Sequence, residues 1–90
     1  MQDNTNTDFV NSGNVKIYPT PAKDFINIAI SNYTGDLNIE MYDINGRLVK
    51  TTSFDFTGNY SLDLNGLSTG VYVVKLSGND LNYSEKLVVN

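Results

Sequence analysis

The feature that most restricts the fold of this chain is an apolar–polar alternation with a period of two residues. Ile26, Ile28 and Ile30 alternate with Asn27 and Ala29, and a similar pattern recurs over 37–41. Successive side chains of a β-strand point to opposite faces, so each such segment predicts a strand with one buried face. No window of the sequence carries apolar residues at helical spacing over three turns. The chain is therefore predicted to be all-β.

Turn-forming residues separate the predicted strands at intervals typical of a sandwich. We expect strands over 15–18, 26–30, 37–44, 47–56, 60–64, 71–77 and 81–89. Asn45-Gly46 is the strongest hairpin signal, because both residues tolerate the positive φ of a type I′ turn. The segment 71–77 carries apolar residues on both faces, which favours a central position in its sheet. The prediction is an immunoglobulin-like antiparallel β-sandwich of about seven strands.

Composition excludes several functional classes. The chain has 90 residues, enough for one domain, and contains neither histidine nor cysteine. A Ser-His-Asp triad, an imidazole base and a thiolate metal site are therefore ruled out. The net charge of −4 and the absence of a Lys/Arg cluster argue against nucleic-acid binding. No apolar run is long enough to span a bilayer, and we predict neither a cofactor nor catalytic activity.

The first 14 residues differ in character from the rest. They are rich in Asn, Asp, Thr, Ser and Gly and show no periodicity. Such a composition is typical of a solvated linker. We expect 1–14 to be a flexible linker to an upstream domain, and 15–90 to be the folded domain.

Two D-x-N-G segments, Asp43 to Gly46 and Asp63 to Gly66, are similar to the first half of an EF-hand loop. Neither is followed by the bidentate glutamate that completes such a loop. Asp and Asn also favour turns, because their side chains bond the local backbone. We therefore interpret both segments as turns. Calcium stays open only through ligands pooled from separate loops.

Three blocks of the sequence, 15–28, 39–49 and 67–76, in this order resemble the type A C-terminal sorting domains of the type IX (Por) secretion system of Bacteroidetes. The first block, 15–28, is similar to the family's YPNPAxDxLxI opening, with Thr20 where Asn is usual. The second, 39–49, resembles its Tyr-Asp-x-x-Gly-(Arg/Lys) block, and the third, 67–76, its L-x-x-G-x-Y signature. The close of the chain, 85–90, is similar to the family's short terminal strand, with Asn90 where Lys is frequent.

Physical chemistry suggests what several of these motif residues do. The fixed φ of Pro19 and Pro21 predicts an extended exit from the first strand with no further pairing. Gly46 and Gly70 stand where turns favour positive φ. Tyr72 resembles the corner tyrosines of immunoglobulin-like sandwiches, whose hydroxyl bonds nearby backbone.

The resemblance implies a C-terminal signal that directs a cargo protein across the outer membrane. The implied route runs through the periplasm to the cell surface or the medium, where a sortase-like protease removes the domain by cutting in the linker. The implied partners are the outer-membrane secretion apparatus and this signal peptidase. The motif and recognition residues carried over are Tyr18, Pro19, Pro21, Asp24, Tyr42, Asp43, Gly46, Arg47, Gly70, Tyr72, Lys86, Leu87, Val88 and Val89.

The last strand, 81–90, is the expected recognition element. A terminal edge strand offers unpaired backbone groups to a partner strand, and the same edge allows self-association. The alternative is an accessory sandwich that binds carbohydrate or a surface protein. An exposed coplanar pair among Tyr33, Tyr60 and Tyr83 would favour that alternative, whereas we expect half-buried strand residues. A clean polar surface with an accessible last strand would favour sorting.

Overall fold

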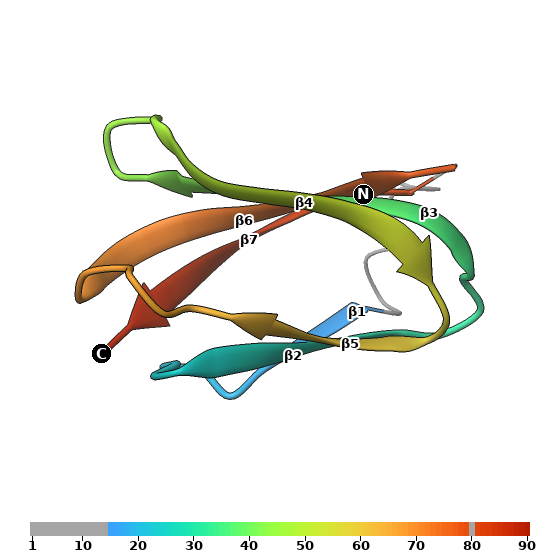
Figure 1. The fold of residues 1–90 in the computed structure, drawn as a ribbon, viewed down its shortest axis with the longest axis horizontal. Coiled ribbons are helices and arrows are strands. Elements are labelled where there is room, and N and C mark those ends of the chain that lie inside the picture. The colour runs from blue at the N-terminus through green and yellow to red at the C-terminus, as the bar shows by residue number, and fades with distance from the viewer. Residues whose placement is uncertain (1–14, 80) are drawn as a thin grey trace, which may run out of the picture.

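The computed structural model describes residues 15–79 and 81–90 and folds them into two facing antiparallel sheets (Figure 1). The three-stranded sheet has the order β1 (Val15–Tyr18), β2 (Phe25–Ile30), β5 (Asn59–Asp63). The four-stranded sheet has the order β4 (Leu48–Phe56), β3 (Gly35–Asp43), β6 (Gly70–Gly78), β7 (Leu81–Val89). The predicted all-β sandwich of seven strands is confirmed. The expected linker over 1–14 lies outside the described residues.

The strand order decides which backbones are fully paired. β6 lies between β3 and β7, so the segment with apolar residues on both faces is central, as predicted. β4 and β7 are the edges of the four-stranded sheet. No helix long and apolar enough to cross a membrane occurs among the described residues.

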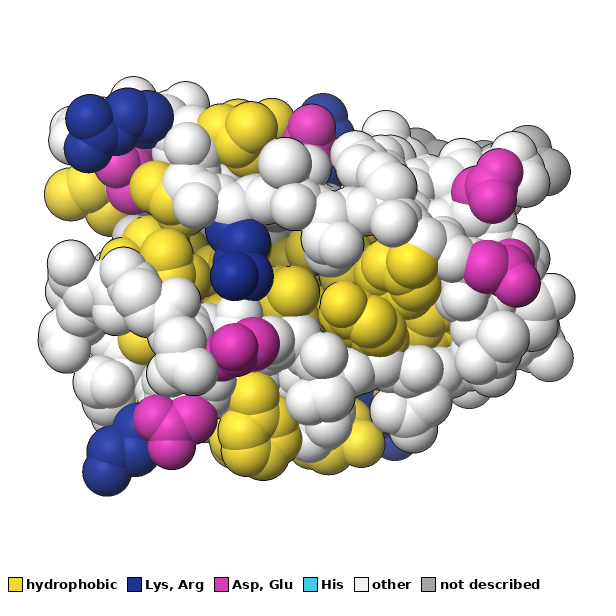
Figure 2. Space-filling model, in the orientation of Figure 1, with side chains coloured by type: hydrophobic (Ala, Val, Ile, Leu, Met, Phe, Trp, Pro, Cys, Tyr) yellow, Lys and Arg dark blue, Asp and Glu magenta, His cyan; other side chains and the backbone are white. Residues whose placement is uncertain are grey.

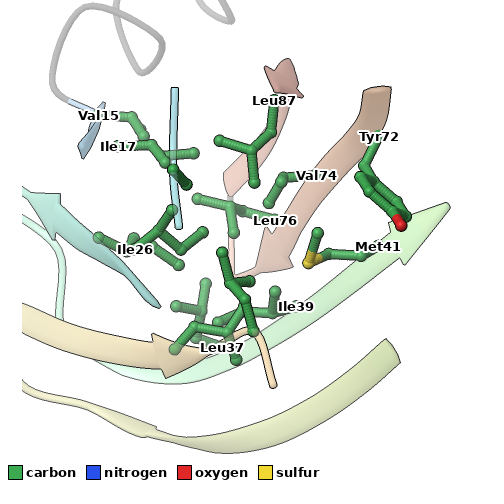
Figure 3. Close-up of a cluster of buried hydrophobic side chains, with 14 of the residues drawn as sticks. Val15, Ile17, Ile26, Leu37, Ile39, Met41, Tyr72, Val74, Leu76 and Leu87 are labelled. Atoms are coloured by element: carbon green, nitrogen blue, oxygen red, sulfur yellow. The ribbon is translucent and has the colours of Figure 1, made fainter. Parts of the chain in front are cut away.

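The core lies between the two sheets and is built by the alternating residues. Ile17 and Ile26 from one sheet point toward Leu37, Val74 and Leu87 from the other (Figure 3). Complete burial of one such side chain stabilises the fold by about 1.5–3 kcal/mol relative to leaving it exposed. None of the polar or charged side chains of the described residues is fully buried. The sandwich is therefore held by an apolar layer.

Aromatic side chains close one side of this layer. Phe54 of β4 stacks on Tyr60 of β5 with ring centroids 3.9 Å apart, and Tyr33 lies 6.3 Å from Phe56. In Figure 2 apolar side chains are visible in the gap between the two layers. Charged side chains are scattered on this face, without an extended patch of one sign.

The turn between β3 and β4 differs from the predicted type I′ turn. The N–H of Gly46 donates to the carbonyl oxygen of Asp43 at 2.9 Å, and Gly46 has a φ of +80°. Asn45 is not among the residues with positive φ. The loop is therefore a type I turn followed by a left-handed glycine, the three-residue hairpin connection. Only Gly46 needs the positive φ that the sequence assigned to both residues.

The segment after β1 also differs from expectation. Residues 19–21 form bends, and the Tyr18–Pro19 and Thr20–Pro21 peptide bonds are both cis. The chain does not exit extended, and pairing resumes at Ala22, which forms a parallel bridge with Val89. The prolines end β1 at Tyr18, as predicted, and pairing returns only at Ala22, which unlike them keeps its N–H.

Candidate functional site

Motif blocks that are far apart in sequence meet at one end of the sandwich. Asp43 of β3 lies opposite Tyr72 of β6, which lies opposite Leu87 of β7. Gly70 lies opposite Val89, whose other side pairs with Ala22. The β3–β4 turn, the start of β6 and the C-terminus lie together at the left of Figure 1. We call this region, made of 19–24, 43–47, 67–72 and 86–90, the motif end.

Asp43 organises the β3–β4 turn. Its Oδ1 accepts hydrogen bonds from the N–H groups of Asn45 at 2.9 Å and Arg47 at 3.0 Å. Its Oδ2 lies 3.4 Å from Nε of Arg47. The N–H of Arg47 is the main cause that lowers the pKa of the Asp43 carboxyl, with Asn45 and the guanidinium acting in the same direction against partial desolvation. The Tyr-Asp-x-x-Gly-Arg block therefore stabilises its own turn.

Tyr72 fulfils the role predicted for a corner tyrosine. Its side chain is only 6% exposed, and its hydroxyl donates to the carbonyl oxygen of Ser68 at 2.6 Å. This bond holds the 64–70 turn against the start of β6. Gly70 differs from expectation, because its φ is not positive and it already pairs with Val89 as the first residue of β6. Strand pairing at this position satisfies its backbone, so no left-handed conformation is needed.

The proline segment brings the β1–β2 connection to the last residues of the chain. The N–H of Ala22 donates to the carbonyl oxygen of Val88 at 2.8 Å, and its own carbonyl accepts the N–H of Asn90 at 2.7 Å. Ala22 is only 1% exposed. Nearby, the carbonyl of Asp24 accepts the N–H of Leu64 at 2.9 Å. The first motif block thus ties the two sheets together, while Tyr18, Pro19 and Pro21 remain exposed.

β7 exposes only some of its predicted recognition residues. Leu87 and Val89 belong to the core, Val88 is half-buried, and Lys86 is exposed. The backbone C=O of Val88 and N–H of Asn90 point away from β6, because both bond Ala22. Backbone groups of every second residue in a strand point to the same side, so those of Asn82, Ser84 and Lys86 point to the same outer edge. No backbone partner for these groups occurs among the described residues. The edge is therefore open over 82–86 and closed at its end.

Tyr42 belongs to the outer face of the four-stranded sheet. Its hydroxyl bonds Oε1 of Glu40 at 3.0 Å, and this bond is the main cause that raises the pKa of the phenol. On the same face, Leu48, Val71 and Val73 are exposed apolar residues that sequence reasoning did not select as site residues. The sequence signal for these residues is the apolar character of both faces of 71–77, which also favours a central strand position and therefore does not by itself indicate an exposed apolar surface.

The observations that would favour the alternative functions are absent from the described part of the chain. Tyr33, Tyr60 and Tyr83 are half-buried and packed against the core, as expected, and do not form an exposed coplanar pair. Burial and a hydrogen bond to Glu85 raise the pKa of Tyr83 to about 12. Asp63, like Asp43, accepts the N–H of an asparagine two residues later, at 2.9 Å. No group of three acidic, histidine or cysteine side chains that could hold a metal occurs among the described residues.

Comparison with known families identifies the chain. The model of the secretion system C-terminal sorting domain matches residues 16–90, which include the three motif blocks except Val15, and the last strand. No curated protein shows a significant match. This family is not a family of enzymes, and its members signal export to the cell surface or the extracellular space through interaction with the secretion machinery. The chain therefore belongs to the C-terminal sorting domains of the type IX secretion system.

Proposed function

We propose that the type IX machinery recognises this domain in its folded state by adding a strand to the open edge of β7, beside the motif end. The cargo would pass through the periplasm, and a sortase-like signal peptidase at the cell surface would then cut within or beside 1–14. The family match over 16–90 supports the sorting function. The open edge of β7, next to the converging motif blocks, is the observation that carries the mode of recognition.

The burial pattern supports recognition of backbone rather than of the apolar side chains of β7. Leu87 and Val89 are in the core, so a partner of the folded domain cannot contact their side chains. Backbone N–H and C=O groups are available at Asn82, Ser84 and Lys86. β-augmentation draws its affinity from such main-chain hydrogen bonds.

The sorting function is tested by export of a reporter. A periplasm-targeted fluorescent protein carrying residues 1–90 at its C-terminus is expressed in a bacterium with the type IX machinery, beside the same reporter without the domain. We expect only the fusion to reach the surface or the medium. Mass spectrometry of the exported reporter then locates the cut, which we expect within or beside 1–14. A fusion that stays in the periplasm while folded would refute the sorting function.

The mode of recognition needs a variant that leaves the core intact. Deletion of 86–90 would remove Leu87 and Val89 from the core, so it would confuse unfolding with loss of recognition. Ser84→Pro instead removes one outward N–H and blocks the edge, whereas Ser84→Ala keeps that N–H. We expect loss of export for Ser84→Pro and normal export for Ser84→Ala, with both domains folded by circular dichroism. Equal export of the two would exclude strand addition at this edge.

A further inference from the structure

The outer face of the four-stranded sheet is divided into an apolar and a polar half. Near the motif end, Leu48, Tyr42, Val73 and Lys86 form one cross-strand row, and Val71 and Val88 lie opposite each other in the next. The following rows are polar, with Asn38 opposite both Ser53 and Ser77. We call Tyr42, Leu48, Val71, Val73 and Val88 the outer strip.

The exposure of the outer strip is not explained by folding. Leu48, Val71 and Val73 are 46%, 39% and 42% exposed, on the face that an antiparallel sheet turns to water. Strand propensity accounts for single exposed valines scattered over a sheet. It does not account for apolar residues that adjoin across four strands and are confined to the half of the face beside the motif blocks. Adjoining exposed apolar side chains of this kind mark interaction surfaces.

The outer strip is continuous with the open edge of β7. Lys86 ends the row that begins at Leu48, and its N–H and C=O groups point to the free edge. Two residues later, Ala22 occupies the edge at Val88 and Asn90. A strand added to β7 is therefore restricted to 82–86 and must leave the edge at Val88. At that point its continuation lies beside the apolar row of Val71 and Val88.

The charged residues beside the outer strip indicate which side chains the added strand carries. Arg47 lies against Asp43, and Lys75 stands directly opposite Glu40 on the same face. No carboxylate is within ion-pair distance of Lys86 among the described residues. Glu40 is bonded to Tyr42 on the side of the strip that faces the polar rows, whereas Lys86 is the charged residue at the point where the edge and the strip meet. A carboxylate placed there would find an exposed ammonium group.

We propose that the outer strip and the 82–86 edge form one docking surface for an extended segment of the secretion machinery. The segment pairs with β7 over 82–86, places a carboxylate beside Lys86, and covers Val71, Val73 and Leu48 with apolar side chains. This inference rests on the proposed sorting function and adds the chemistry of the partner. It also explains why the motif blocks build one end of the sheet, because the turns there fix the position of the strip relative to the edge.

The export assay tests the strip with substitutions that keep the strands. Val71→Thr/Val73→Thr retains β-branching but replaces two methyl groups by hydroxyls, and Phe25→Thr removes a side chain of similar exposure, 46%, from the outer face of the other sheet. Two lost methyl contacts correspond to about a tenfold weaker interaction. We expect export of the double variant to be about tenfold slower at limiting expression, and export of Phe25→Thr to be unchanged.

Charge reversal provides a second variant that leaves every apolar contact in place. Lys86→Glu is compared with Lys16→Glu, an exposed lysine on β1 of the other sheet. We expect export to fall for the first and to stay normal for the second, with both folded by thermal unfolding. Normal export of both Lys86→Glu and the valine variant, alongside an exported wild-type fusion, overturns the docking surface and leaves the sorting function standing. A wild-type fusion that is not exported overturns both.

A second copy of the chain is the other candidate occupant of the surface, and sedimentation of the purified chain tests it through the oligomeric state. We expect a monomer for the wild type and for Val71→Thr/Val73→Thr. A wild-type dimer that the double substitution dissociates, together with unchanged export, would assign the strip to a second copy of the chain and overturn the proposal.

Discussion

Replacing Tyr72 by phenylalanine isolates the structural role of the corner hydroxyl. The substitution keeps the buried ring and removes only the donor to the carbonyl of Ser68, a bond of 2.6 Å. An intramolecular hydrogen bond contributes about 1 kcal/mol net. Ser68 is exposed, so water can bond its carbonyl in the variant and the larger penalty of a buried orphan acceptor does not apply. We therefore expect a loss of about 1 kcal/mol in the free energy of unfolding.

The assay is chemical and thermal unfolding of the purified chain, with Tyr42→Phe as the matched control. For a domain of this size, 1 kcal/mol corresponds to a decrease in Tm of about 4–8 °C. Tyr42 bonds Glu40 at the surface, so its hydroxyl is expected to change stability by less than about 0.5 kcal/mol. A Tyr72→Phe variant no less stable than Tyr42→Phe would refute the assignment of the corner bond as a stabilising contact.

Export by the same variant separates folding from recognition. A domain stable by about 5 kcal/mol or more remains folded after losing 1 kcal/mol. Because the hydroxyl bonds the Ser68 carbonyl of the same domain and the Tyr72 side chain is only 6% exposed, we expect the Tyr72→Phe fusion to be exported at the wild-type rate. Loss of export by a folded Tyr72→Phe domain would mean that the hydroxyl is read by the machinery, contrary to this reasoning.

Three further predictions concern stability. Gly78→Ala would place a methyl group against the Tyr33 hydroxyl and a backbone carbonyl, so we expect a loss of about 1–3 kcal/mol by urea unfolding; an unchanged midpoint would contradict the observed packing. Gly46→Ala, at a φ of +80°, should lower the free energy of unfolding by about 1 kcal/mol. Gly70→Ala, where φ is not positive, should lower it by less than about 0.5 kcal/mol, and equal losses would refute the turn assignments. The pKa of Tyr83, raised from 10.0 to about 12, favours the neutral phenol in the folded state. The stabilisation from this shift is complete below pH 10 and is lost as the pH rises through about 12. We therefore expect the free energy of unfolding to fall less for Tyr83→Phe than for the wild type over this pH range.

Local patterns were enough to predict the elements of the fold. Alternation in segments such as 26–30 identifies strands because side-chain direction depends only on the backbone of that segment. The hairpin at Asn45-Gly46 and the hydroxyl bond of Tyr72 also depend on neighbours within four residues. The turn type was mispredicted because Asn-Gly is compatible with more than one hairpin loop, and the Asp43 carboxylate, bonding two N–H groups of the loop, selects among them.

The candidate site was less accessible to sequence reasoning. Motif residues could be named individually, but no local signal separates Leu87, which is in the core, from Lys86, which is exposed, until the strand's inward face is known. The alternation of Val71 and Val73 with buried residues is visible in the sequence, but their solvent exposure depends on whether another layer covers the outer face of the four-stranded sheet, and none of the described residues does so. Exposure is a property of the assembled sheets.

What the sequence alone determines about this protein is therefore its seven strands, most of its turns and its membership of a sorting family, because these follow from short-range periodicity and spacing. The tertiary structure decides the strand order, the union of the motif blocks at one end and the boundaries of the free edge. The contact between Ala22 and the last residues of β7 is the clearest case. The two hydrogen bonds that close the edge join segments near opposite ends of the sequence, and only the docking of one sheet on the other brings their backbones within bonding distance.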